Sequence, residues 1–111
     1  METQPVEGFF QYEMKVGTIL EAALNEQARK PAYRLVIDFG PDGIKKSSAQ
    51  IVDRYQPGDL VGRQVVAVTN FPPRQVASVI SEVLVLGATD EEGAVVLLRP
   101  DMTVANGTVI S

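Results

Sequence analysis

The sequence predicts an all-β domain closed into a small barrel, and three observations support this fold class. Seven short segments rich in valine, isoleucine and leucine follow one another along the 111 residues. Turn-forming glycine, proline, asparagine or aspartate residues separate these segments. The composition, with 45% hydrophobic and 22% charged residues, is that of one globular domain, without repeats or linkers. A barrel is favoured over an open sheet because closure leaves no strand edge exposed.

The strands and turns can be placed along the chain in order. A short helix is expected between the third and fourth strands, at residues 49–55, where Pro57-Gly58 would end it. Asp42-Gly43 and Glu92-Gly93 indicate hairpin turns rather than catalytic carboxylates. The strands are expected at residues 16–24, 33–39, 44–48, 64–69, 79–86, 95–99 and 108–110.

Two of the expected strands are apolar on both faces, within residues 81–86 and 95–98. A small barrel needs only its inward face apolar, so something must cover the other face. A second copy of the chain is the favoured cover, which predicts a homodimer. The alternative is cover from within the chain, by the C-terminal tail and by a short helix over residues 6–14, where apolar residues recur at helical spacing.

The composition excludes most catalytic chemistry. The chain has no cysteine and no histidine, which removes disulfides, thiol nucleophiles, imidazole bases and the usual zinc ligands. We therefore expect a protein that is not an enzyme and holds no metal or cofactor. The longest apolar runs, residues 83–88 and 94–98, have the length of strands, and residues 1–8 do not have the pattern of a signal peptide. These features favour a cytoplasmic protein that does not insert into a membrane.

Charge is unevenly distributed along the chain, whose formal net charge is −4. Residues 1–28 carry one basic and five acidic residues, and residues 75–111 do the same, which gives −4 for each segment. Residues 29–74 carry eight basic and four acidic residues, which gives +4. This pattern is that of a local basic surface on an acidic protein, although charge alone fits ordinary solvated side chains as well.

Six motifs in the same order resemble the tRNA-binding OB-fold domain family, which occurs alone and at the C-terminus of some methionyl-tRNA synthetases. Within it, the chain is most similar to the CsaA-type subgroup, which is described as secretion-related chaperones. This resemblance implies a five-stranded OB-fold barrel over residues 1–111, with short helices, RNA binding on the barrel, and N- and C-terminal extensions that mediate a dimer. The motifs are MKVGTI at 14–19, KPAYRLVIDFG at 30–40, KKSSAQI at 45–51, NFPPR at 70–74, SEVLVLG at 81–87 and LRPD at 98–101.

The chain departs from the broad family in two of these motifs. The family pattern Ser-x-Gly-Met is replaced by SEVL at residues 81–84, and an Asn-Leu-Lys-Pro type segment is replaced by NFPP at residues 70–73. A lysine is thus absent and Glu82 is gained, which should weaken phosphate binding. In both motifs, the residues of this chain resemble those of the CsaA-type subgroup.

An OB-fold binds nucleic acid with a basic groove, so basic residues on the first three strands are the first candidates for phosphate contacts. These are Lys15, Arg34, Lys45 and Lys46, with Arg74 in the loop after the fourth strand. Each of them also fits the role of a solvated surface charge.

Four polar residues complete the candidate RNA site. Ser47 and Ser48 could donate hydroxyls to phosphate or ribose, or could simply end a strand. Asn70 could contact a base edge or a ribose hydroxyl, or could serve the turn before Phe71. Ser81 matches the serine of the family motif, and otherwise would pair across the sheet.

Aromatic residues are scarce, at 6% of the chain. Tyr33, Phe39 and Phe71 are candidates for base stacking, but packing in the core fits each of them better. Few aromatic side chains favour recognition of shape over stacking of single strands, and this favours tRNA as the partner.

The alternative function is binding of unfolded or precursor polypeptides, as the CsaA-type resemblance implies. An apolar groove near Phe71, Pro72 and Pro73, or an exposed sheet edge, would provide the peptide site. Binding through such a groove should tolerate salt, whereas RNA binding should weaken steeply as salt rises.

Overall fold

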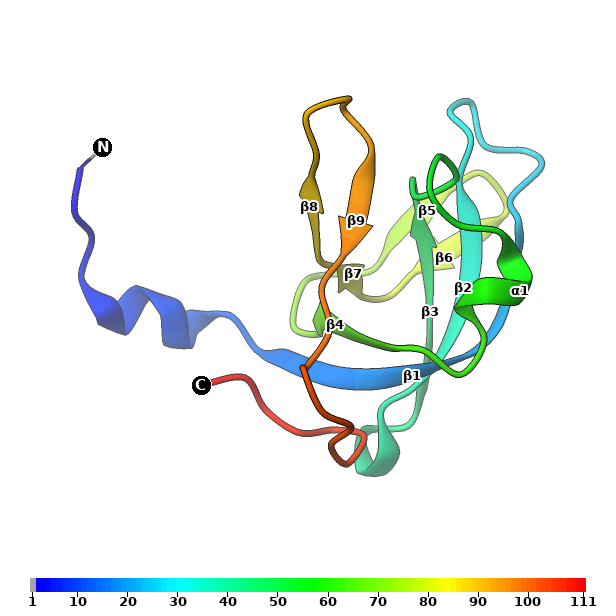
Figure 1. Cartoon of the computed structure of the whole chain (residues 1–111). Coiled ribbons are helices and arrows are strands. Elements are labelled where there is room, and N and C mark those ends of the chain that lie inside the picture. Colours follow the sequence, from blue (N-terminus) through cyan, green and yellow to red (C-terminus); the bar gives the residue numbers. More distant parts are fainter. Residues whose placement is uncertain (1) are drawn as a thin grey trace.

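The centre of the fold is a five-stranded antiparallel sheet in the order β3–β2–β1–β4–β7. It is seen in a computed structural model that describes residues 2–111 (Figure 1). The sheet curls into a nearly closed barrel, which confirms the fold class expected from the sequence. Its strands are β1 (Met14–Leu24), β2 (Tyr33–Asp38), β3 (Ile44–Ala49), β4 (Gln64–Val68) and β7 (Leu84–Val85).

Side chains help to close the barrel between β3 and the residues that precede β7. The Glu82 amide donates to the Lys46 carbonyl over 2.8 Å, and the Lys46 amide donates to the Glu82 carboxylate over 3.0 Å. The Ser47 hydroxyl donates to the Val83 carbonyl over 3.0 Å. A hydroxyl and a carboxylate therefore satisfy backbone groups that regular strand pairing would otherwise satisfy.

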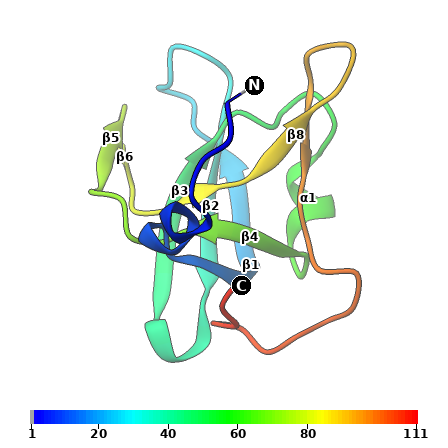
Figure 2. The same ribbon diagram turned by 90° about the vertical axis from the view of Figure 1, so that its left-hand side faces the viewer.

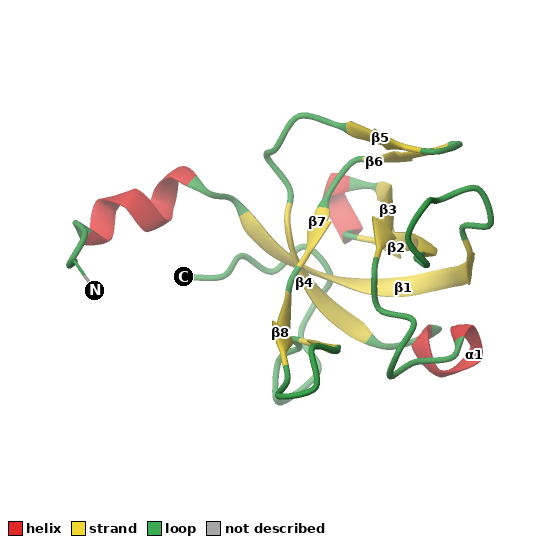
Figure 3. Cartoon of the chain, turned by 90° about the horizontal axis from the view of Figure 1, so that it is seen from above, coloured by secondary structure: helices red, strands yellow, loops and turns green. Residues whose placement is uncertain are grey.

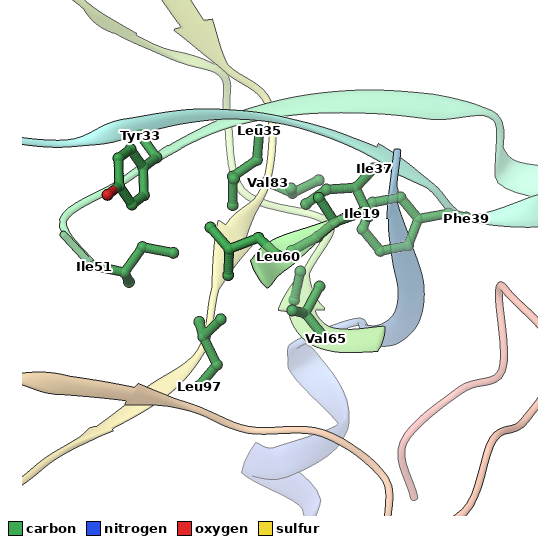
Figure 4. Packing of buried hydrophobic residues seen from close by; sticks show 11 residues of the cluster. Ile19, Tyr33, Leu35, Ile37, Phe39, Ile51, Leu60, Val65, Val83 and Leu97 are labelled. Atoms are coloured by element: carbon green, nitrogen blue, oxygen red, sulfur yellow. The ribbon is translucent and has the colours of Figure 1, made fainter. Parts of the chain in front are cut away.

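The core fills the barrel with side chains from alternate strand positions, as the sequence pattern predicts. In β2, Tyr33, Leu35 and Ile37 all belong to the buried cluster, whereas Arg34 is half-buried. Leu60, from the short helix after β3, packs among the same residues (Figure 4). This period of two places Arg34, Val36 and Asp38 on the other face of β2, where Val36 is buried but Arg34 and Asp38 are partly exposed.

The helix expected at residues 49–55 is wrong in its position. The short helix is α1 (Pro57–Leu60), and residue 49 still belongs to β3. Pro57 begins the helix instead of ending one, since the first helical position needs no backbone donor. Gln56 precedes it and, with Asp59, forms a reciprocal capping box.

Two short hairpins lie outside the barrel sheet. One pairs β5 (Arg74–Val76) with β6 (Val79–Ser81), and the other pairs β8 (Gly87–Thr89) with β9 (Val95–Leu97). Figure 2 shows β5–β6 and β8 on opposite sides of the barrel. The sequence did not predict β5 or β8, because three-residue strands carry too little pattern to be distinguished from loops.

The single strand expected at residues 79–86 is wrong, since the chain forms β6 and β7 there. Glu82 and Val83 leave the β5–β6 hairpin to bond with β3, and this interrupts the strand. The two expected turns are confirmed: Gly43 and Gly93 adopt φ angles of 88° and 84°, which favour glycine.

The N-terminal segment forms a 3-10 helix, η1 (Val6–Gln11), that projects from the barrel as an arm (Figures 1 and 3). The helix ends before the expected residue 14, because β1 begins there. None of its residues is buried, and Val6 and Phe10 are each 68% exposed. Cover of the barrel by this helix within one chain is therefore not what the structure shows. None of the helices in residues 2–111 has the length and apolarity to cross a membrane.

The C-terminal segment lies along the first half of β1, where a strand at residues 108–110 was expected. The Val16 amide donates to the Thr108 carbonyl, and the Ile110 amide donates to the Met14 carbonyl, both over 2.9 Å. Val109 forms an isolated bridge of the strand type, opposite Lys15. The C-terminal segment therefore lies beside the start of β1, where the arm joins the barrel (Figure 1).

The turn at Gly40 packs against this C-terminal segment and predicts a large effect on stability. Gly40 has a φ of 64°, and a Cβ there would lie 2.5 Å from the Asn106 carbonyl oxygen. We expect Gly40→Ala to lower the free energy of unfolding by about 2–4 kcal/mol in urea denaturation. Gly43→Ala is the matched control, since its φ is 88° but no atom lies within 4 Å of the added carbon. Gly43→Ala should lower the free energy of unfolding by only about 1–2 kcal/mol. Equal losses for the two variants would contradict the proposed clash.

Candidate nucleic-acid interface

A groove of about 710 Å³ opens at one end of the barrel. It lies between the β1–β2 loop (residues 25–32), the end of β3, the β5–β6 hairpin, and strands β7 and β9, which Figure 1 shows together at that end. Its size falls in the range of small-ligand sites. The apolar residues of its lining include Ala32, Ile51, Val76, Leu84 and Val95.

Three basic side chains line the same groove. Arg29 and Lys30 come from the β1–β2 loop, and Arg74 comes from the first position of β5. All three are exposed, and none forms an ion pair with a carboxylate of residues 2–111. The groove therefore combines an apolar floor with uncompensated positive charge, an arrangement that suits a ligand with anionic groups.

A row of polar side chains crosses four neighbouring strands beside the groove. Arg34 of β2 lies opposite Ser48 of β3, whose amide donates to the Ser81 hydroxyl of β6 over 3.1 Å. Ser81 in turn lies opposite Arg74 of β5. Four residues predicted from the sequence are thus brought together, and Arg34 lines a second hollow of about 190 Å³ next to the groove.

Lys45 and Lys46 lie further along β3, opposite Ile37 and Val36 of β2. Neither lines the groove, and neither forms an ion pair among the described residues. The Glu82 carboxylate accepts the Lys46 backbone amide, so a negative charge lies on this part of β3. Because successive side chains of a strand point to opposite faces, Lys46 shares the outer face of β3 with Ser48, whereas Lys45 lies on the face of Ser47.

Ser47 and Ser81 both serve the closure of the barrel. Ser47 is only 1% exposed, and its hydroxyl donates to the Val83 carbonyl. The Ser81 hydroxyl is within 3.2 Å of the same carbonyl oxygen and accepts the Ser48 amide. The Ser47 side chain therefore faces the core, where a ligand on the barrel surface does not reach it.

Lys15, which was also expected to bind phosphate, lies in a cluster of carboxylates. Its ammonium is 2.9 Å from the Asp42 carboxylate and 3.4 Å from that of Glu13. The bond to Asp42 raises the pKa of Lys15. A hydrogen bond from the Thr69 hydroxyl, over 2.6 Å, lowers the pKa of Glu13. This cation is already neutralised and does not line the groove.

Asn70 holds the N-terminal arm. Its side-chain oxygen accepts the Glu13 amide over 2.8 Å, and its side-chain nitrogen donates to the Gln11 carbonyl over 2.9 Å. Phe71 makes an edge contact with Tyr12, with ring centroids 5.8 Å apart. Asn70 and Phe71 therefore contact the N-terminal segment at the base of the arm, and neither they nor Pro72 and Pro73 line the groove.

Two of the aromatic candidates for base stacking are core residues. Tyr33 and Phe39 are buried, and the Tyr33 hydroxyl donates to the Tyr55 carbonyl over 2.6 Å. Among residues 2–111, no aromatic side chain lines the groove. The packing interpretation of these two residues is confirmed.

Sequence reasoning missed Arg29 and Lys30 as site residues, although both contribute to the basic middle segment. Their position directly before Pro31, in the loop between the first two strands, was the available indication, since that loop borders the binding face of OB-folds. Arg54, another cation of the middle segment, is neutralised by Asp90 at 3.0 Å and by Glu92 at 3.4 Å. The bond that Asp90 accepts from the Ala94 amide lowers the pKa of that carboxyl.

A sequence profile of the putative tRNA-binding domain matches residues 14–109, which covers the barrel, both hairpins and most of the C-terminal segment. The chain belongs to this family. The match includes every strand of the barrel and every residue that lines the groove. The expectation from the sequence motifs is therefore confirmed.

Two solved structures of CsaA chaperone proteins are similar to this chain over nearly its whole length. The chaperone CsaA of Bacillus anthracis is 53% identical, with a TM-score of 0.93 over 99% of this chain and 100% of that chain. A CsaA chaperone protein of Picrophilus torridus is 44% identical, with a TM-score of 0.91 over 98% and 100% of the two chains. These similarities extend over the arm and the barrel together.

Among curated relatives, the methionine–tRNA ligase of Porphyromonas gingivalis is 36% identical over 104 residues, or 94% of this chain. The chain spans only 15% of the length of that ligase. The two proteins therefore share the tRNA-binding domain, and the similarity does not extend to the rest of the ligase.

Proposed function

We propose that this tRNA-binding domain binds structured RNA, and tRNA above all, in the groove at the end of the barrel. The observation that carries the proposal is the set of three uncompensated cations, Arg29, Lys30 and Arg74, around an apolar floor. The groove lies between the loop after the first barrel strand and the hairpin that precedes the last one, where OB-folds bind oligonucleotides. We propose no catalytic step, and a cytoplasmic location suits a tRNA partner.

Different residues in and beside the groove would contact different parts of the RNA. Arg29, Lys30 and Arg74 would contact phosphates, with Arg34 on β2 and Lys46 on β3 extending the track along the outer face. Lys45, on the opposite face of β3, would contact a phosphate only outside this track. Ribose and base edges would lie against the aliphatic floor, near the Ser48 hydroxyl. Since no aromatic ring lines the groove, recognition would depend on the shape of the RNA backbone rather than on stacking.

Binding of purified protein to fluorescently labelled tRNA, measured by anisotropy, tests the proposal. We expect an affinity in the micromolar range or tighter at low salt. If four phosphates are contacted, affinity should fall roughly 100-fold between about 50 and 200 mM salt, because binding releases counterions. Absence of binding at low salt, or binding that does not respond to salt, would contradict the proposal.

We also propose that the protein is a homodimer in which the arm of each chain contacts the other chain. Val6 and Phe10 project from the barrel, and no residue of η1 is buried. On the barrel, Val96 and Leu98 remain exposed and do not line the groove. Apolar surfaces of this kind are characteristic of protein interfaces, and two barrels would present two grooves to one RNA.

A second candidate function is binding of unfolded polypeptides in the same groove. Its apolar floor, together with the similarity to proteins described as CsaA chaperones, supports this alternative. Suppression of aggregation of an unfolded client, with and without excess tRNA, would test it. A polypeptide in the groove should be displaced by tRNA, whereas Phe71→Ala should not change the suppression, because Phe71 lies against the arm. Suppression unaffected by tRNA would contradict a shared groove.

A further inference from the structure

Asn25 is one of two buried polar residues of residues 2–111, with 6% of its surface exposed. It follows β1 directly, at the start of the loop that carries Arg29 and Lys30. Its backbone amide donates to the Ala32 carbonyl over 2.9 Å, and its carbonyl accepts the Ala28 amide over 3.1 Å. The backbone of Asn25 thus holds the β1–β2 loop in shape at both of its ends.

The side chain of Asn25 joins this loop to two other elements. Its amide nitrogen lies 3.2 Å from the Val76 carbonyl oxygen, at the tip of the β5–β6 hairpin, and 3.4 Å from the Ser48 hydroxyl of β3. These two acceptors belong to residues that line the groove, whereas Asn25 itself lines the smaller hollow on the other side. The Asn25 side chain therefore links the β1–β2 loop to the β5–β6 hairpin and to β3, and it does so from the side of the smaller hollow.

The β5–β6 hairpin needs such a contact because it is a two-stranded sheet with three residues in each strand. Isolated two-stranded hairpins are marginally stable in water. Its turn contains Ala77 at a φ of 55°, a conformation that costs energy for any residue with a Cβ. Arg74 stands on this hairpin, two residues before Val76, so its position depends on how firmly the hairpin is held.

We propose that Asn25 is a positioning residue that fixes the width of the groove, and with it the distance of Arg74 from Arg29 and Lys30. The Val76 contact holds the hairpin, and the backbone bonds hold the loop, so one residue sets both basic walls. This role in RNA binding rests on the proposed function, whereas the mechanical link between loop and hairpin stands on the contacts alone. An aspartate in its place would lack both donors at nearly the same volume.

The test compares Asn25→Ala and the nearly isosteric Asn25→Asp with Asn106→Ala. Asn106 is the matched control because its side chain also makes two hydrogen bonds between segments, in this case as the acceptor from Thr18 over 2.7 Å and from Gln64 over 3.2 Å. It does not line the groove. For each variant, tRNA affinity across salt, unfolding in urea and amide hydrogen exchange would be measured.

Asn25→Ala should weaken tRNA binding about fivefold at near-physiological salt and reduce the salt slope by about one, as expected for one lost phosphate contact. Asn25→Asp should weaken it at least as much, because it also adds a negative charge. The amides of β5 and β6 should exchange at least several times faster, while those of β1 and β4 keep their rates. Asn106→Ala should lower stability to a similar extent without changing tRNA affinity or its salt slope.

A double-mutant cycle with Arg74→Gln separates positioning from general destabilisation. In the Arg74→Gln background, Asn25→Ala should change tRNA affinity less than twofold, since the contact that it positions is already gone. Additive losses, or unchanged hydrogen exchange in β5–β6, would overturn the proposal. Failure of the parent protein to bind tRNA would overturn the proposed function and the role in RNA binding, while hydrogen exchange would still test the mechanical link.

Discussion

A variant in which Arg29, Lys30 and Arg74 are all replaced by glutamine is expected to bind tRNA about 100-fold more weakly at near-physiological salt. Each of these side chains lines the groove without a carboxylate partner in residues 2–111, so each is free to neutralise a phosphate. Loss of three such contacts should also reduce the slope of log affinity against log salt by about three. Fluorescence anisotropy at several salt concentrations measures both quantities.

The control for this variant must have the same net charge. Replacing Thr3 and Gln4 by glutamate and Arg99 by glutamine adds two negative charges and removes one positive charge, so both variants have a net charge of −7 instead of −4. None of these three residues lines the groove. The control should bind nearly as the parent does. Equal weakening of both variants would mean that overall charge, and not the groove, determines binding.

Replacement of both Val6 and Phe10 by aspartate is expected to convert the proposed dimer into a monomer. Both side chains are 68% exposed on the arm, and burial of such residues against a second chain would dominate the interface. Light scattering after gel filtration should show a mass of 12.0 kDa instead of twice that value. Unfolding in urea should change little for the barrel itself, because η1 contributes no buried residue.

Thr3→Asp with Gln4→Asp is the matched control, since it adds the same charge to the same arm without removing apolar surface. This control should remain dimeric. A parent protein that is already a monomer, or a Val6 and Phe10 variant that remains a dimer, would contradict the proposed role of the arm.

The sequence was sufficient to predict the barrel because its strands follow a local rule. In β2, alternate residues enter the core, and the turns at Gly43 and Gly93 require a backbone that glycine adopts readily. The rule fails where a strand depends on distant partners. Residues 79–86 have a continuous strand pattern, but Glu82 and Val83 bond with β3, and no local pattern in the sequence reports this.

Prediction of the site was limited in the same way. The basic middle segment was evident from charge counting, but which cations are free depends on acids elsewhere in the fold. Lys15 is neutralised by Asp42, which the β2–β3 turn brings to it, and Arg54 is neutralised by the β8–β9 turn. Asn70 was a candidate for RNA contact, yet its side-chain oxygen and nitrogen are both hydrogen-bonded to the N-terminal segment. Only the fold distinguishes a free cation or amide from one already engaged.

The side-chain closure of the barrel has a consequence for the order in which the chain assembles. Strands β1, β2 and β3 are consecutive, and only five residues separate β2 from β3, so their pairing closes short loops. The hydrogen bond between the Lys46 amide and the Glu82 carboxylate joins residues 36 positions apart, and it requires the Glu82 side chain to be fixed in one rotamer. We therefore expect the meander of β1, β2 and β3 to form early in folding and the barrel to close late. Since the groove is bounded by the end of β3 and by the hairpin that precedes Glu82, the binding surface would be completed only in that last step.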